Sequence, residues 1–283
     1  AEAADRAYES ARASAARFLN AADDEIVFTS GATAALNLVA NSFGAGLQPG
    51  DRVLVSQAEH HSNFVPWQML RERRGIALDI LPVLPDGRLD TGRLPEMLRA
   101  ETRLVAVTQC SNVTGAITDV ASIVAAARRV GARVLLDGAQ AVQHGPQDVQ
   151  ALGVDFYAFS GHKCFGPGGV GVLWARGELL AAMPPFLGGG GMIGEVSLNG
   201  YSWAEPPRRF EAGTPPIAQA IGLGAEDLFL EQVSAKIYLA RVTARRGRLD
   251  EALEICSDCF SQLTEMDQED GPPALEVADV SEL

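Results

Sequence analysis

Lysine is almost absent from this chain of 283 residues. Only Lys163 and Lys236 occur, and arginine supplies the other 21 basic side chains. Arginine stays protonated in proteins, whereas a desolvated lysine can lose its proton and attack a carbonyl group to form a Schiff base. An isolated lysine is more often a solvated surface residue. The neighbours of Lys163 must therefore decide whether it is a surface residue or a reactive amine.

Cysteine is scarce as well, since only Cys110, Cys164, Cys256 and Cys259 occur. Four cysteines are too few for a disulfide scaffold in a chain of this length, which indicates a reducing, cytoplasmic setting. No apolar run approaches the roughly 20 residues of a membrane span, and no signal peptide opens the sequence. We therefore expect neither export nor a membrane partner.

Basic residues are missing from the end of the chain. All 23 of them precede residue 249, and 11 acidic residues follow from Asp250 onward. The first 249 residues therefore carry only −2 of the net charge of −13. Without a basic stripe, and with an acidic end that repels phosphate, the chain is not expected to bind nucleic acid.

Short apolar runs alternate with helical stretches along most of the chain. The apolar runs cover residues 26–28, 53–55, 78–81, 104–107, 134–136, 156–159 and 170–174. The clearest helical patterns cover residues 1–20, 32–43, 64–74 and 119–130. This alternation predicts an α/β fold with a mostly parallel seven-stranded sheet covered by helices. In such sheets, ligands bind at the carboxyl ends of the strands.

The later part of the chain departs from this pattern. Residues 184–216 are rich in Gly and Pro, which is typical either of a plain flexible loop or of a mobile loop over a site. Residues 239–263 resemble one tetratricopeptide helix pair, which cannot bury its own face alone, and the acidic end resembles a flexible segment. We predict a large domain over residues 1–233 and a divergent helical tail over residues 234–283.

Polar residues follow several of the predicted strands. The run 29–33, Thr-Ser-Gly-Ala-Thr, leads into a helix, where backbone N–H groups and the Thr33 hydroxyl can hold an anion or simply cap the helix. Asp137 ends an apolar strand, and a carboxylate there needs a cation or a donor. Asp137 is therefore either a cap or ion-pair residue, or the partner of a protonated ring nitrogen.

Two further strand ends carry histidines. Ser160, His162 and Lys163 share one turn after the run 156–159, and His60-His61 follows the run 53–55. Adjacent histidines rarely bind one ion, and no Cys or His lies at ligand spacing, so we expect no metal site. Together the strand ends offer a phosphate cradle, a carboxylate for a pyridinium, an amine for an aldehyde and a flat ring. Pyridoxal 5′-phosphate requires this set.

Several longer motifs extend this pattern. They are Thr29-Ser30-Gly31-Ala32-Thr33, Glu59-His60-His61-Ser62-Asn63 with Val65-Pro66-Trp67-Gln68, Ser111-Asn112-Val113-Thr114-Gly115, Asp137-Gly138-Ala139-Gln140-Ala141, Ser160-Gly161-His162-Lys163 and Arg209-Phe210-Glu211-Ala212-Gly213-Thr214-Pro215. In this order they resemble the fold type I pyridoxal phosphate enzymes of the class V aminotransferase group. The chain is most similar to the SufS-type cysteine desulfurases and selenocysteine lyases, over about residues 1–233.

The resemblance implies a role for each matching residue. Lys163 would hold the cofactor as a Schiff base and later carry the α-proton. Asp137 would pair with the pyridinium nitrogen, Gln140 would bond the ring hydroxyl, and His60 would stack on the ring. Asn112 would lie near the ring hydroxyl and the substrate carboxylate.

The resemblance also implies how the phosphate is held and which partners take part. The phosphate would be held by Thr33, Ser160, His162 and the backbone of Ala32. Thr214 would reach the phosphate of a partner subunit, which implies a homodimer. The expected substrate is L-cysteine or L-selenocysteine, and a sulfur-acceptor protein is the expected further partner.

The sequence departs from this family in residues that choose the reaction. The family's segment before Ala1 and its small domain after about residue 233 have no evident counterpart, nor have its nucleophilic cysteine and its carboxylate-binding arginine. Cys256 and Cys259 lie in a predicted helix with acidic neighbours, which weakens a thiol nucleophile, and Cys164 matches a packing position. A cysteine-free elimination, another class V reaction such as epimerisation or transamination, and a degenerate binding protein therefore stay open as alternatives.

Overall fold

The computed structural model describes residues 2–225 and 253–254. These two ranges belong to separate compact units, so the fold described here is that of residues 2–225. Of the predicted tail, only residues 253–254 are described, and both are helical. The rest of the predicted helix pair, with Cys256 and Cys259, lies outside the described residues.

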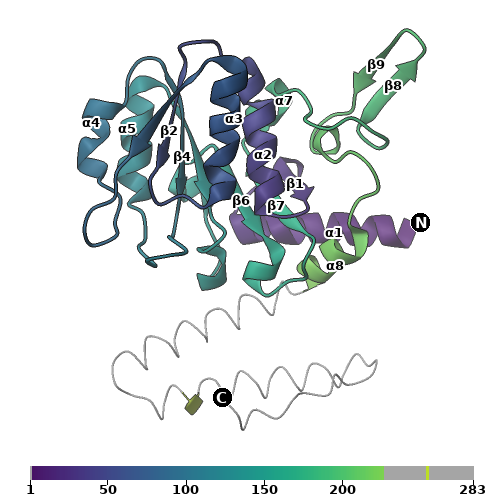
Figure 1. Ribbon diagram of the computed structural model, residues 1–283. Coiled ribbons are helices and arrows are strands. Elements are labelled where there is room, and N and C mark those ends of the chain that lie inside the picture. The colour runs from purple at the N-terminus through teal and green to yellow at the C-terminus, as the bar shows by residue number, and fades with distance from the viewer. Residues whose placement is uncertain (1, 226–252, 255–283) are drawn as a thin grey trace. The chain divides into compact units, whose positions relative to one another are not determined.

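Seven strands within residues 2–225 form one sheet in the order β1-β7-β6-β5-β4-β2-β3 (Figure 1). They are β1 (Ile26–Thr29), β2 (Arg52–Ser56), β3 (Ala77–Leu81), β4 (Thr102–Thr108), β5 (Arg133–Asp137), β6 (Phe156–Ser160) and β7 (Gly171–Ala175). Strands β3, β2, β4, β5 and β6 pair in parallel, and β7 runs antiparallel between β6 and β1. The predicted mostly parallel seven-stranded sheet is confirmed.

Helices cover both faces of this sheet (Figure 1). They are α1 (Glu2–Leu19), α2 (Ala32–Ser42), α3 (Val65–Arg74), α4 (Leu94–Met97), α5 (Val120–Val130), α6 (Val149–Leu152), α7 (Gly177–Ala182) and α8 (Ile217–Ala225). Apolar residues of α2, α3 and α7 share one core cluster with the sheet. Helices α1 and α8 pack side by side. Within the described ranges, no helix has the length and apolar character needed to cross a bilayer.

The continuous apolar strands follow from burial on two faces. Leu135 of β5 belongs to the cluster beneath α2 and α3, and successive side chains along a strand point to opposite faces. On β6, Ala158 belongs to the same cluster, whereas the ring of Phe159 packs against Phe18 of α1, with centroids 6.1 Å apart. A strand covered on both sides has no position for a polar residue until it ends.

The Gly- and Pro-rich region 184–216 contains a hairpin that the sequence analysis did not predict. Strands β8 (Ile193–Ser197) and β9 (Gly200–Trp203) pair antiparallel, and the hairpin extends away from the main sheet (Figure 1). Its strands are short and their side chains are mostly exposed, so they lack the alternation of apolar and polar residues that marks a half-buried strand.

A buried ion pair joins α1 to the segment that follows Arg208–Phe210. The carboxylate of Glu211 accepts hydrogen bonds from Arg12 Nη1 at 2.7 Å and Nη2 at 3.0 Å. It also accepts from the backbone N–H of Phe28 at 2.7 Å and the hydroxyl of Tyr8 at 3.1 Å. The Arg12 and Glu211 side chains are only 3% and 9% exposed, so the pair lies almost entirely out of water, and Arg12 Nε also donates to the partly exposed Glu9 at 2.9 Å.

We expect Glu211→Gln to lower the free energy of unfolding by about 3 kcal/mol, because it leaves the Arg12 charge buried without its main partner. Urea unfolding of the full chain measures this. Arg6→Ala is the matched control, since the Arg6–Glu2 pair on the same helix is 74% and 93% exposed and is worth less than about 1 kcal/mol. Equal losses in the two variants would contradict the prediction.

Candidate active site

The carboxyl ends of five strands lie on one edge of the sheet. Strands β1, β2, β4, β5 and β6 run in the same direction, so the residues after them come together there. The predicted site residues that follow these ends are Ala32, Thr33, His60, Asn112, Asp137, Gln140, Ser160, His162 and Lys163.

Asp137 is the last residue of β5 and is 4% exposed. Its Oδ1 accepts a hydrogen bond from the N–H of Ala139 at 3.0 Å. Among the described residues, its other oxygen has no hydrogen-bond donor. Burial raises the pKa of Asp137, while the Ala139 N–H and the nearby charges of Lys163 and His60 act in the opposite direction. Three predicted site residues therefore share one electrostatic environment.

Lys163 lies in a short 3-10 turn, Gly161–Cys164, directly after β6. Its side chain is half-buried, and within residues 2–225 its ammonium group has no hydrogen-bond or ion-pair partner. Cys164 is 1% exposed and its Sγ donates to the carbonyl of Gly161 at 3.2 Å, which agrees with a packing role. The amine at 163 is thus available for a reaction, and the neighbouring thiol is not.

The start of α2 is tied to the end of β6. The N–H of Ala32 donates to Ser160 Oγ at 2.8 Å. A Cβ at Gly171 would lie 2.4 Å from the Cα of Gly31, so the absence of a side chain there lets β7 approach the helix start. Free N–H groups at a helix N-terminus favour an anion, and the hydroxyl of Ser160 already lies beside them. These residues fit a phosphate group.

His60 is exposed and its ring orientation is fixed by Ser62. The Nδ1 atom of His60 accepts from the Ser62 N–H at 3.2 Å and lies 2.8 Å from Ser62 Oγ. A backbone N–H can only donate, so Nδ1 carries the lone pair and Nε2 carries the hydrogen. The flat ring predicted at this position is therefore held in one tautomer.

Glu59 precedes His60 and was missed as a site residue by the sequence analysis. Its carboxyl accepts from the hydroxyl of Ser56, from Asn63 Nδ2 at 2.6 Å and from the N–H of Thr108 at 2.8 Å. Burial raises the pKa of Glu59 to about 8, although these three donors oppose the shift. Its place between a strand end and a predicted site residue was the signal that could have identified it.

The remaining predicted residues differ in how firmly they are held. Gln140 Oε1 accepts from Gln143 Nε2 at 3.0 Å. Asn112 is exposed in a turn that Ser111 Oγ stabilises by accepting from the N–H groups of residues 113 and 114. Thr214 is exposed and is not hydrogen-bonded to the phosphate-cradle residues of its own chain.

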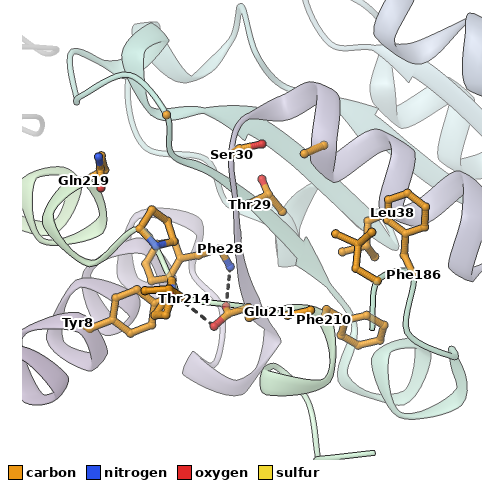
Figure 2. Close-up of a pocket in the computed structure, with 16 residues that line it drawn as sticks. Tyr8, Phe28, Thr29, Ser30, Leu38, Phe186, Phe210, Glu211, Thr214 and Gln219 are labelled. Atoms are coloured by element: carbon orange, nitrogen blue, oxygen red, sulfur yellow. Dashed lines mark hydrogen bonds between the residues drawn. The ribbon is translucent and has the colours of Figure 1, made fainter. Parts of the chain in front are cut away.

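Thr214 instead lines a cavity of about 410 Å³ (Figure 2). The cavity walls are mostly apolar, with Thr29 and Ser30 from the end of β1 on one side and the anchored Glu211 on another. His60, Asp137 and Lys163 do not line it. The cavity therefore adjoins the predicted phosphate cradle without being the place where the amine and the carboxyl meet.

The two adjacent histidines do not converge on one point. The rings of His60 and His61 are tilted by 40° with centroids 6.0 Å apart. In the part of the chain that the structure describes, no three His, Cys, Asp or Glu residues are grouped as metal ligands.

The sequence model of the aminotransferase class-V family matches residues 1–277. The chain belongs to this family. The match extends beyond residue 233, where the recognised motifs end. A cysteine desulfurase of Dickeya dadantii (strain 3937) is 56% identical over 246 residues, which cover 86% of this chain and 59% of that protein. The chain thus spans somewhat more than half the length of this relative.

Solved structures agree with this assignment. The Escherichia coli cysteine desulfurase CsdA, in an S-sulfonic acid form, is 43% identical with a TM-score of 0.80, covering 86% of this chain and 63% of that one. C-DES, a cystine C-S lyase, is 30% identical with a TM-score of 0.76, covering 84% of this chain and about 65% of that one. One C-DES mutant holds glycine covalently linked to the PLP-cofactor, and another C-DES structure holds its product, cysteine persulfide. The predicted pyridoxal phosphate fold and cofactor class are confirmed.

We expect the stability of the cofactor-free protein to fall as pH rises from about 5 to about 8 and then to level off, in part because of Glu59. Its folded pKa of about 8 exceeds the ordinary value of 4.5, so over this range the folded state binds more protons than the unfolded state. Glu59→Gln should flatten the slope. Asp137 contributes in the same direction to both proteins. Urea unfolding midpoints at pH 5.5, 7 and 9 measure the slopes, and parallel slopes in both proteins would refute this assignment.

Proposed function

We propose that this chain is the cofactor-binding part of a pyridoxal phosphate enzyme of the cysteine desulfurase type, with Lys163 as the lysine that binds the cofactor. One observation carries the proposal. The buried carboxyl of Asp137, which has one oxygen without a donor in the described chain, lies within electrostatic reach of the amine of Lys163. The second oxygen of this carboxyl keeps its capacity to accept a hydrogen bond, and a pyridinium N–H is a donor that suits a carboxylate in a mostly buried site.

The bound cofactor would supply an aldehyde and an electron-accepting ring. The amine of Lys163 would hold that aldehyde until the amino group of the substrate takes its place, and the released Nζ would then carry the proton to and from the α-carbon of the substrate. Asp137 would keep the ring nitrogen protonated, and His60 would lie against the ring face with its Nε2–H directed away from Ser62. Gln140 and Asn112 would bond the ring hydroxyl, with Asn112 near the substrate carboxylate.

The phosphate would lie at the start of α2. Its oxygens would accept from the side chains of Thr33, Ser160 and His162, and from the N–H of Ala32, which would exchange its present acceptor, Ser160 Oγ, for the phosphate. Thr214 is exposed beside the cavity in Figure 2, which supports its reaching a second subunit. We therefore propose a homodimer that acts in the cytoplasm on L-cysteine or L-selenocysteine, with a sulfur-acceptor protein as a further partner.

The described cysteines favour a second candidate reaction. Cys110 and Cys164 are both buried, 7% and 1% exposed, and burial raises the pKa of the Cys110 thiol. Neither is placed as a nucleophile for the sulfur of a substrate. A C–S lyase reaction, in which the α-proton is removed and the thiolate leaves with its electron pair, needs no enzyme thiol, and the relative C-DES is a cystine C-S lyase.

The cofactor assignment predicts a yellow protein. Purified protein mixed with pyridoxal phosphate should develop a visible absorbance band that Lys163→Ala abolishes. Lys236→Ala is the matched control, since it removes the only other lysine and should keep the band. After borohydride reduction, peptide mapping should find the label on Lys163, and a colourless wild-type protein would exclude both proposed enzyme reactions.

Light scattering of the same samples tests the proposed homodimer, and a monomer would contradict it.

The two reactions give different products from L-cysteine. Desulfuration transfers sulfur to a thiol and leaves alanine, whereas elimination leaves pyruvate, ammonia and sulfide. We expect alanine as the main product, measured by amino-acid analysis with and without a reductant that accepts the sulfur. Pyruvate in equal amount to sulfide, unaffected by prior thiol alkylation, would support the C–S lyase reaction instead. Neither product, with amino-group transfer or racemisation of the substrate, would indicate another class V activity.

A further inference from the structure

Glu59 is a half-buried carboxyl to which the proposed reaction gives no role, and its contacts link three segments. Ser56 is the last residue of β2, Thr108 is the last residue of β4, and Asn63 lies in the short turn His61–Asn63. The pairing of β2 with β4 ends at Val55 and Ala106. The N–H of Thr108 therefore lies beyond the last paired residues of β2 and β4, and the carboxyl of Glu59 accepts its hydrogen bond.

Asn63 connects this carboxyl to the backbone of His60. Its side-chain Nδ2 donates to Glu59 at 2.6 Å, and its main-chain N–H donates to the carbonyl of His60 at 2.8 Å. Its Oδ1 accepts from Trp67 Nε1 at 3.1 Å, and both Asn63 and Trp67 are 0% exposed. Because the Trp67 N–H can only donate, the amide of Asn63 is fixed with Nδ2 toward Glu59. Asn63 thus ties the side chain of Glu59 to the carbonyl of His60.

We propose that Glu59 is a positioning residue that fixes the turn carrying His60, so that the His60 ring is held against the cofactor ring. The proposal rests on the proposed function for the cofactor, but the placement of His60 is independent of it. Glu59 itself touches neither substrate nor cofactor in this scheme. It acts by joining the turn 59–63 to the ends of β2 and β4.

The direction of the hydrogen bonds makes this arrangement specific for a carboxyl group. One obligatory donor meets each oxygen, the Thr108 N–H at Oε1 and the Asn63 Nδ2 at Oε2. Only Ser56 can reverse its role, since its hydroxyl both donates and accepts, and it can therefore receive the proton of a neutral Glu59. An amide at position 59 would always direct its NH₂ group at another donor.

The chain offers a compensating variant. In Glu59→Gln the amide NH₂ meets Asn63 Nδ2, whereas in the double variant Glu59→Gln, Asn63→Asp it meets a carboxylate oxygen. The other oxygen of an aspartate at 63 can still accept from Trp67, and the glutamine Oε1 can still accept from Thr108. The double variant thus restores a donor–acceptor match at every hydrogen bond, while the acidic group moves from residue 59 to residue 63.

The test compares wild type, Glu59→Gln, the double variant and Glu211→Gln. The last is a control that weakens a distant buried pair without touching the turn 59–63. The first readout is imidazole ¹⁵N NMR of the cofactor-free protein, in which only four histidines occur. We expect the His60 signal of wild type and Glu211→Gln to show the Nε2–H tautomer, Glu59→Gln to show a mixture, and the double variant to recover the wild-type signal.

The second readout uses pyridoxal phosphate. Glu59→Gln should bind it about tenfold more weakly, the order expected for one lost charge-assisted or buried hydrogen bond, with a reduced induced circular dichroism of the bound cofactor. The double variant should recover both. Wild-type His60 signals and dichroism in Glu59→Gln would overturn the proposal, as would a folded double variant that is no better than the single one.

Folding failure does not confuse the outcome. If Glu59→Gln alone does not fold, recovery of the His60 signal in the double variant supports the proposal, and failure of both to fold overturns it. If the wild type binds no pyridoxal phosphate, the proposed function fails, while the NMR comparison in the cofactor-free protein still decides the role of Glu59.

Discussion

Strands β1, β2, β4, β5 and β6 point in one direction, and every proposed cofactor contact within the chain except Thr214 follows the end of one of them. Parallel pairing sets this arrangement because it brings the carboxyl ends of the strands to the same edge. The middle of each of these strands is apolar, since helices cover both faces. The polar residues of the site are therefore placed by the sheet, and their loops only orient them.

Three buried or half-buried carboxyls show how the fold offsets the cost of removing an acid from water. Glu211 is paired with Arg12. Glu59 is surrounded by three donors, and its raised pKa makes the neutral form accessible near neutral pH. Asp137 has one donor within the described chain. Of the three carboxyls, Asp137 therefore has the most capacity left to accept a further hydrogen bond.

Glu211 and Glu59 each anchor a segment near the proposed site, but they anchor different segments. Glu211 ties the segment before Thr214 to α1 and β1, beside the cavity shown in Figure 2. Glu59 ties the turn of His60 to β2 and β4. One carboxyl thus steadies the segment proposed to reach a second subunit, and the other steadies the ring proposed to stack within the same subunit.

The sequence by itself determined the layered fold, the chemical class of the cofactor and the strand ends at which the site is proposed. Apolar runs such as 134–136 mark strands buried on both faces, and the rarity of lysine drew attention to Lys163. The hairpin β8–β9 and the contacts of Glu59 were decided only by the tertiary structure. The hairpin has exposed strands without apolar alternation, and the partner Thr108 lies 49 residues from Glu59 along the chain. A hydrogen bond between such distant residues depends on the pairing of β2 with β4, and local sequence patterns do not predict that contact.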